Sequence, residues 1–472
     1  MTNPTRFSVR LPKFLNQLLE HELIRRMLKN SGYLFSATGI SAVISMVQSI
    51  LVARLLGVAG FGVLGTITMF TSTINKFASF RMGELVIKYV GYYTEHEDHP
   101  RAAAIFKAAA ITEMAASFVA FGLVLLLAPV GAKYLAKDTS LSNLFIIYGL
   151  IVLANLIAES STGLLQIFDR FRRIALLDVL ESILTLGIIG VTYVTTILSC
   201  PDCSLASTTA GLSSTDILFR VLMAYLLGKT LGALGKTIAA MFEASHRWGS
   251  RWWKTPLGLL RTQVRELAHF AVSTNISASL SLINKDSELL WVSLLRTPTE
   301  TGYYKLALTL ANIVQMPINP LPQATYPELS RETARQNWGN VRHVLRQGSL
   351  MAGSYTLATA FGLAIISIPL IYYIYKPEFM PAYPALLILL LGFLPANTFF
   401  WRRVALLSLG RPDFPAKLNL ILATFKLLGI ALLVPRYGYL ANAALLAAFY
   451  WTGSVISVLK VRSLISDREV AP

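Results

Sequence analysis

Residues 110–130, AITEMAASFVAFGLVLLLAPV, form an apolar run long enough for a helix to cross a lipid bilayer. The hydrocarbon core of a bilayer is about 30 Å thick and takes roughly 20 apolar residues in a helix. Runs of the same kind recur along the chain, for example LMAGSYTLATAFGLAIISIPLIYYI at residues 350–374. The sequence therefore predicts a protein that crosses a membrane many times.

The composition agrees with that prediction. Of the 472 residues, 54% are hydrophobic and only 14% are charged, whereas a soluble protein carries roughly 25% charged residues because its surface must be wetted. The net charge of +17 would point to nucleic acid in a soluble protein. In a membrane protein it is expected, since Lys and Arg are retained on the cytoplasmic side. We therefore predict no nucleic-acid partner.

We expect an all-α fold of about twelve transmembrane helices in two pseudo-symmetric six-helix bundles. The predicted spans are 32–56, 61–82, 105–129, 141–160, 174–198, 216–241, 267–292, 303–326, 349–375, 383–401, 416–434 and 438–460. With the N-terminus inside, the basic residues gather in cytoplasmic segments such as 170–173, 247–265 and 331–346, and outer turns such as 57–60 are nearly neutral. An even number of spans preserves this alternation and places both termini in the cytoplasm.

The same criteria divide the chain into five segments. These are a basic amphipathic N-terminal segment at 1–31, a first six-helix bundle at 32–245, a basic cytoplasmic linker at 246–266, a second bundle at 267–462 and a cytoplasmic tail at 463–472. The N-terminal segment alternates basic and apolar residues, which is typical of a helix on an anionic leaflet; a solvated basic tail is the alternative. No cleavable signal peptide is recognisable.

The two halves look related in sequence. Residues 55–64, LLGVAGFGVL, and residues 294–306, which begin LLR and end GYYKL, each have a Leu-Leu pair, a short outer turn and a glycine-aromatic pair opening the next helix. Upstream, SATGISA at 36–42 resembles VSTNISA at 272–278. Six spans per half give both halves the same orientation, so we expect a parallel repeat about an axis along the membrane normal.

Both cysteines, Cys200 and Cys203, fall in the longest predicted outer loop, residues 199–216. A local disulfide is compatible with the outer side of the membrane, and two idle thiols are the alternative. A redox centre would need a βαβ context that the sequence lacks, and a zinc site would need two more ligands.

Ionisable side chains inside the predicted spans are candidates for a functional site, because each costs about 2.5–3.5 kcal/mol at mid-bilayer unless it has a partner or a hydrated cavity. Lys and Arg are natural partners for phosphate oxygens. We predict a net cationic cavity between the bundles, lined by Lys229, Lys236, Lys285, Lys426, Arg81 and Lys88, with Glu84, Asp286 and Glu288 as cavity or ion-coupling carboxylates.

The alternative is that these groups neutralise one another. The pairs in sequence reach are Lys285 with Asp286 or Glu288, Arg81 with Glu84, and Lys236 with Glu243. Lys229 and Lys426 have no carboxylate nearby in sequence, so a cavity role is favoured for both.

Signals of catalysis are missing from the sequence. The six histidines make no metal-binding spacing, and no GxxxxGK[ST] phosphate-binding loop occurs. We predict no catalytic residue, no metal and no cofactor, and a protein that is not an enzyme.

The order of these features resembles the oligosaccharide flippase family (Wzx-type, polysaccharide biosynthesis) of the superfamily that includes multidrug-and-toxin extruders. The resembling stretches are LKNSGY at 28–33, LVARLLG at 51–57, GFG at 60–62, GYYKLA at 302–307, Pro320 and YPEL at 326–329. With the span pattern they cover nearly the whole chain. The family often has Asp where this chain has Glu288, so only a polar cavity role is carried over to that residue.

The resemblance implies a two-bundle fold that alternates between inward-open and outward-open states. It implies transport of a polyprenyl-pyrophosphate-linked oligosaccharide across the bacterial plasma (inner) membrane for cell-surface polysaccharide assembly. The implied partners are this lipid-linked oligosaccharide, membrane lipids, and polysaccharide polymerase and chain-length proteins.

Two other functions remain open. A cation-coupled multidrug or small-molecule antiporter of the same fold would be expected to have an acidic cavity, whereas lysines are prominent here. A membrane polysaccharide polymerase or ligase would need a substantial outer catalytic loop, and the longest predicted outer loop is mostly Ser, Thr and Ala.

Overall fold

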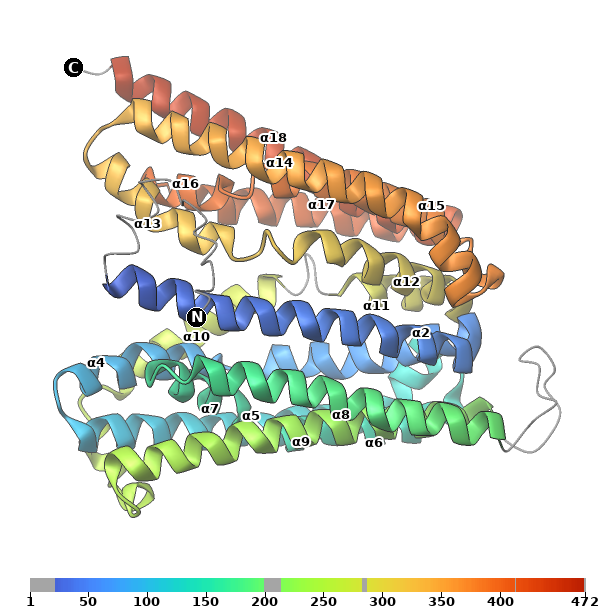
Figure 1. Ribbon diagram of the computed structural model, residues 1–472, viewed down its shortest axis with the longest axis horizontal. Coiled ribbons are helices and arrows are strands. Elements are labelled where there is room, and N and C mark those ends of the chain that lie inside the picture. The colour runs from blue at the N-terminus through green and yellow to red at the C-terminus, as the bar shows by residue number, and fades with distance from the viewer. Residues whose placement is uncertain (1–21, 199–213, 282–286, 412, 471–472) are drawn as a thin grey trace, which may run out of the picture.

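The computed structural model describes residues 22–198, 214–281, 287–411 and 413–470. All regular structure within these ranges is helical. Figure 1 shows two groups of helices that lie close together at one end of the molecule and diverge toward the other. We call these the turn end, where α2 kinks and α17 turns into α18, and the basic end, where segments 168–170 and 249–263 lie.

The first group contains the helices of the N-terminal half. They are α2 (Glu22–Ala78), α3 (Met82–Leu85), α4 (Gly91–Glu95), α5 (His99–Gly131), α6 (Ser142–Ala154), α7 (Ala158–Ile167), α8 (Phe171–Leu198) and α9 (Ser214–Trp248). Short 3-10 or π segments occur at Val86–Val90, Ala132–Ala136, Thr139–Leu141, Trp252–Lys254 and Leu257–Leu260. The next helix, α10 (Val264–Ser281), packs against α2 and α3.

The second group contains the helices of the C-terminal half. They are α11 (Glu288–Leu295), α12 (Pro298–Gln315), α13 (Leu321–Ala334), α14 (Trp338–Pro369), α15 (Ala382–Thr398), α16 (Arg402–Ser408), α17 (Asp413–Tyr437) and α18 (Tyr439–Val470). Short segments at Leu370–Tyr375 and Pro377–Phe379 join α14 to α15.

Local sequence sets where several of these helices begin. Asp98, Thr297 and Asn337 each accept a hydrogen bond from a backbone N–H group in the first turn of α5, α12 and α14, respectively. Such caps satisfy donors that have no partner within the helix. In α12 the first residue is Pro298, whose missing N–H costs nothing at that position.

Nine helical segments of the described chain are long and apolar enough to cross a membrane. One of them, residues 36–78, contains the first two predicted spans, because α2 kinks at Gly57 with a φ of 65°. The segments that correspond to predicted spans seven and eight are shorter and more polar, and they fall outside the nine. The prediction of an all-α membrane fold in two bundles is confirmed.

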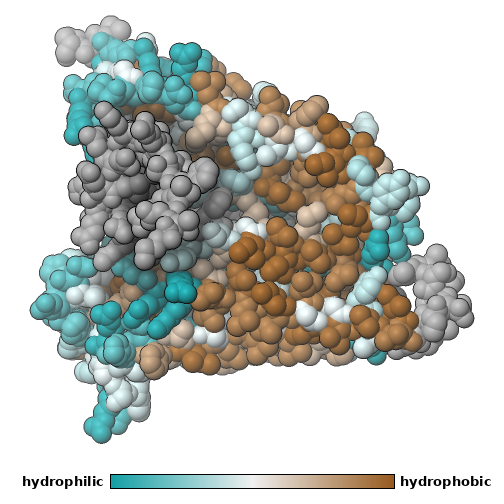
Figure 2. Space-filling view, in the orientation of Figure 1, coloured by the Kyte–Doolittle hydropathy of each residue, from teal (hydrophilic) through white to brown (hydrophobic). Residues whose placement is uncertain are grey.

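The surface of the molecule has the pattern of a membrane protein. Figure 2 shows a broad hydrophobic band between hydrophilic ends. Large apolar side chains such as Phe361, Leu420, Phe425 and Leu432 are at least 59% exposed. A continuous exposed apolar surface of this extent is stable only when lipid covers it.

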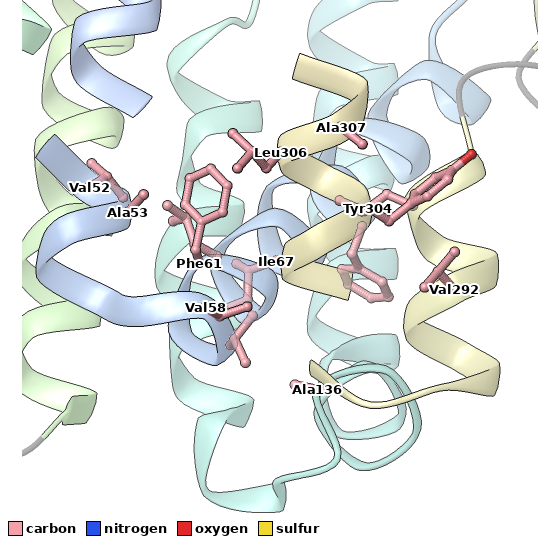
Figure 3. Close-up of a cluster of buried hydrophobic side chains, with 14 of the residues drawn as sticks. Val52, Ala53, Val58, Phe61, Ile67, Ala136, Val292, Tyr304, Leu306 and Ala307 are labelled. Carbon is pink, nitrogen blue, oxygen red and sulfur yellow. The ribbon is translucent and has the colours of Figure 1, made fainter. Parts of the chain in front are cut away.

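The two halves meet at the turn end through two glycines. A Cβ atom on Gly62 would lie 2.0 Å from the carbonyl oxygen of Pro298, and one on Gly302 would lie 2.1 Å from that of Val58. Figure 3 shows Phe61 and Ile67 of α2 in the buried cluster that also contains Tyr304 and neighbouring residues of α11 and α12. The two stretches that look related in sequence therefore pack against each other.

Candidate functional site

A large cavity, with a volume of about 1180 Å³, lies mainly within the second bundle. Its wall is formed by α12, α13, α15, α16, α17 and α18, together with the last turns of α2. Polar side chains that line it include Asn312, Gln315, Asn397, Asn419 and Ser457. A hydrated, polar cavity inside a membrane-spanning bundle can hold a polar group that lipid would exclude.

One carboxylate, Glu288, lines this cavity and is only 2% exposed. It forms an ion pair with Lys426, whose side chain is 3% exposed. Its second oxygen accepts hydrogen bonds from the Tyr304 hydroxyl at 3.1 Å and from Asn442 Nδ2 at 2.9 Å. Lys426 is thus held by a carboxylate that lies 138 residues away in sequence.

The charged groups that line the large cavity are mainly basic. Among the described residues they are, besides Glu288, Lys76, at the end of α2, and Arg402 and Arg403, at the start of α16. The two arginines were not among the predicted site residues, because they follow predicted span ten directly and look like a cytoplasmic loop. The only sequence signal for a site here is a pair of adjacent arginines at the end of an apolar run.

A second cavity, of about 360 Å³, lies against α2 and α8 in the first bundle. Its charged lining residues are Lys236, Asp178 and Glu181. Lys236 Nζ lies 2.5 Å from Asp178 and 3.4 Å from Glu181. Hydroxyl groups of Ser41, Ser45 and Ser182 complete the polar wall.

Glu243, the partner expected for Lys236 from sequence, lies instead among arginines at the basic end. Its carboxylate is 2.9 Å from Arg170, 3.3 Å from Arg173 and 3.4 Å from Arg247. The hydrogen bond to Glu243 raises the pKa of the Arg170 guanidinium. This cluster ties the start of α8 to the end of α9.

Lys229 is exposed and lies seven residues before Lys236, about two helical turns away on the same face of α9. No ion pair of Lys229 occurs within the described part of the chain. Lys285 and Asp286 lie outside the described residues, as do Cys200, Cys203 and the N-terminal segment up to residue 21.

Arg81, Glu84 and Lys88 line neither cavity. Arg81 and Glu84 form the expected pair at 3.6 Å, with both side chains about half exposed. Lys88 lies 3.2 Å from the Tyr89 hydroxyl and 4.6 Å from the centroid of the Phe270 ring. An exposed ion pair such as Arg81–Glu84 contributes about 0–1 kcal/mol to stability.

Several polar contacts between the first half and the helices from α11 onward lie at the turn end. Arg54 donates to the carbonyl oxygens of Ile374 at 2.6 Å and Tyr373 at 2.8 Å. Lys137 donates to the carbonyl oxygen of Leu294 at 2.7 Å, and Lys305 donates to that of Phe61 at 3.1 Å. With the Gly62–Gly302 contact, these bonds close the turn end, while the halves diverge at the basic end (Figure 1).

A further buried carboxylate, Glu113 on α5, was missed by sequence reasoning because it lies within an apolar run. It is 6% exposed and accepts hydrogen bonds from the backbone N–H groups of Glu159 and Ser160, at 2.8 and 2.9 Å, and from the Ser160 hydroxyl at 2.6 Å. These donors belong to the first turn of α7, which Glu113 therefore caps from a neighbouring helix.

Known proteins resemble this chain in sequence. The family model described as polysaccharide biosynthesis protein matches residues 27–332. The inner membrane protein YghQ of Escherichia coli (strain K12) is 21% identical over 360 residues, which are 76% of this chain and 95% of that protein.

Two solved transporters have a similar fold. An inward-facing multidrug resistance MATE family transporter of the MOP superfamily aligns with a TM-score of 0.68 and 14% identity, over 91% of this chain and 96% of that chain. Lipid II flippase MurJ, in an inward closed conformation, aligns with a TM-score of 0.65 and 14% identity, over 91% of this chain and 87% of that chain. The resemblance to oligosaccharide flippases is confirmed, and this chain belongs to the polysaccharide biosynthesis protein family.

Proposed function

We propose that the protein moves a polyprenyl-pyrophosphate-linked oligosaccharide from the cytoplasmic to the outer leaflet of a bacterial plasma membrane by alternating access. The observation that carries this proposal is the polar cavity of about 1180 Å³, whose charged lining is mainly basic, inside a membrane-spanning bundle. The proposal takes the basic end and both termini as cytoplasmic. The predicted bundles at 32–245 and 267–462 then act as the two moving bodies, with α10 packed against the first of them in this state.

The physical requirement is to shield the headgroup from hydrocarbon. A sugar hydroxyl that loses its hydrogen bonds to water costs roughly 2–7 kcal/mol, and an oligosaccharide has many such groups. A polar cavity that opens to one side at a time removes this penalty, while the lipid tail stays in the membrane. The closed turn end and the divergent basic end suit loading from the cytoplasmic side.

The direction of transport agrees with the membrane potential. Moving one negative charge outward across an inside-negative membrane gains about 2.3 kcal/mol per 100 mV. A pyrophosphate headgroup would therefore be driven outward without ATP. Coupling to a proton or cation through Glu288, Glu84 or Asp286 remains a separate hypothesis, and in the structure Glu288 already has Lys426 as its cation.

The second candidate is a cation-coupled antiporter of small molecules. The observation that favours it is the smaller cavity, where Asp178 and Glu181 outnumber Lys236. An excess of carboxylates suits a cationic solute. The larger cavity has the opposite balance, which is why the flippase is preferred.

The test is transport of a fluorescent polyprenyl-pyrophosphate oligosaccharide in proteoliposomes. We expect wild-type protein to expose the label to an impermeant quencher faster than protein-free liposomes. Lys229→Ala and Lys236→Ala test the predicted cationic lining of the first bundle. For Lys426, the pair Lys426→Ala with Glu288→Gln avoids a stranded carboxylate. Efflux of organic cations without movement of any sugar-lipid would support the antiporter instead.

A further inference from the structure

Arg402 lines the large cavity, and no carboxylate in the described ranges pairs with it. One hydrogen bond fixes its guanidinium, from Nη1 to the hydroxyl of Ser454 at 2.5 Å, and Ser454 is fully buried. A guanidinium carries five N–H donors and is always charged. Most of its donors therefore remain for something that occupies the cavity.

Asn397 gives a second and independent indication. Its side chain is 5% exposed and lines the same cavity. Its Nδ2 group has no hydrogen-bond acceptor among the described residues. Buried donors without a partner are rare in proteins, so an acceptor belongs at this position.

The break between α15 and α16 explains how both side chains reach the cavity. In a continuous helix, residues five positions apart point about 140° away from each other. Here α15 ends at Thr398 and α16 begins at Arg402, and both Asn397 and Arg402 line the cavity. The Trp401 indole N–H, which donates to the Ser349 hydroxyl at 2.7 Å, anchors the break against α14.

We propose that this break is the binding site for the diphosphate group of the substrate, with Arg402 and Asn397 as its ligands and the exposed Arg403 as an added charge. The inference rests on the proposed function and names the residues that hold the anionic part of that substrate. A diphosphate offers several acceptor oxygens to the planar guanidinium fork and to the amide.

The position of the break suits a lipid-linked anion. Arg402 is the first residue of α16, which extends about 9 Å along its axis and lies on the side of the basic end (Figure 1). A lipid headgroup that enters from that end would meet Arg402 and the polar side chains of α12 in one cavity. The sugar would then occupy the space next to Asn312 and Gln315.

The test measures binding of polyprenyl diphosphate without sugar to the purified full-length protein in detergent. Polyprenol is the uncharged control ligand. We expect Arg402→Gln and Asn397→Asp to weaken binding of the diphosphate lipid at least tenfold, and Arg402→Lys to weaken it less. Lys417→Gln is the matched control, because Lys417 belongs to the same bundle, is 75% exposed and pairs with Asp413. The Lys417→Gln variant should bind polyprenyl diphosphate with the affinity of the wild type.

Inorganic diphosphate should compete with the lipid for the wild-type site, since the two share the anion. Melting temperatures show which variants are folded, and Arg402→Lys supplies a folded variant if Arg402→Gln does not. Wild-type affinity for the diphosphate lipid in both folded Arg402 and Asn397 variants would overturn the proposal. Equal affinity of wild type for polyprenol would also overturn it.

The transport assay separates this inference from the proposed function. If a folded Arg402→Gln protein flips the sugar-lipid at the normal rate, the proposed diphosphate site is wrong and the proposed flippase function still stands. If the wild type flips no sugar-lipid but Arg402→Gln still abolishes diphosphate binding, the proposed anion site stands and the proposed flippase function is wrong.

Discussion

The ion pair between Glu288 and Lys426 makes the second bundle sensitive to a single substitution. Replacing Lys426 by Met leaves the Glu288 carboxylate buried without its cation, which should lower the free energy of unfolding by about 3–5 kcal/mol. Adding Glu288→Gln removes the stranded charge and should restore most of the loss. Melting temperatures in one detergent measure both changes, with the exposed Lys229→Met as a control that should change little. Equal stability of the single and double variants would show that the ion pair between Glu288 and Lys426 does not stabilise the bundle.

At the scale of single residues, the sequence predicts contacts within a helix better than contacts between helices. Arg81 and Glu84 pair as expected because they are three residues apart. The partners of Lys236 lie 58 and 55 residues upstream on α8, and proximity in sequence cannot reveal them. Arg402 was missed for a related reason, since only the packing of α16 against its neighbours places it on a cavity.

The capping of α7 by Glu113 gives a prediction at the scale of one helix. Glu113→Gln loses the carboxylate charge and places an amide N–H group where the Ser160 donors now point. A buried donor left unsatisfied costs about 1–3 kcal/mol, so we expect a loss of stability of that size. Hydrogen exchange at the first turn of α7 should rise in this variant more than in Ser160→Ala, which removes one bond only. Unchanged exchange at Glu159 and Ser160 would show that Glu113 does not cap the helix.

The contact of α2 with α12 gives a second prediction at the scale of elements. Gly62→Ala would place a Cβ atom 2.0 Å from the Pro298 carbonyl oxygen, so α2 and α12 must separate. Overpacking of this kind costs about 1–3 kcal/mol, which raises the population with an open turn end by a factor of roughly 5 to 150.

The reporter for that opening is Ser293→Cys, because Ser293 on α11 is 1% exposed and Cys is close to it in size. It is introduced with Cys200→Ser and Cys203→Ser, and its rate of thiol labelling should rise when Gly62→Ala is added. Gly122→Ala on α5 is the matched control, because a Cβ there meets nothing within 4 Å. A labelling rate that stays the same in the Gly62 variant would mean that this contact does not hold the turn end closed.

At the scale of whole helices, the sequence predicts membrane-spanning helices well where the hydropathy is high. The structure has helices at every predicted span, and the boundaries differ by several residues because helices such as α9 and α14 extend past the apolar run. The breaks within α6–α7 and α15–α16 were not predicted. These breaks depend on side chains from other helices, as the Glu113 cap of α7 shows. A hydropathy profile contains no information about such contacts.

At the scale of the whole molecule, two features together constrain how it works. The contacts that join the first half to α11, α12 and the segment Leu370–Tyr375 lie at the turn end, and the cavity with Arg402 and Arg403 lies nearer the basic end. A substrate that binds this cavity must therefore enter from the basic end in this state. Which leaflet supplies it then depends on the orientation of the protein in the membrane.

That orientation gives the last prediction. Because basic segments are retained in the cytoplasm, the basic end should lie inside. In a chain with Cys200→Ser and Cys203→Ser, an impermeant maleimide added to intact cells should label Glu378→Cys, an exposed residue at the turn end, but not Lys254→Cys, an exposed residue at the basic end. Permeabilised cells should label both, which controls for intrinsic reactivity. The opposite pattern would load the cavity from the outer leaflet, and the proposed direction of transport would then have to be reversed.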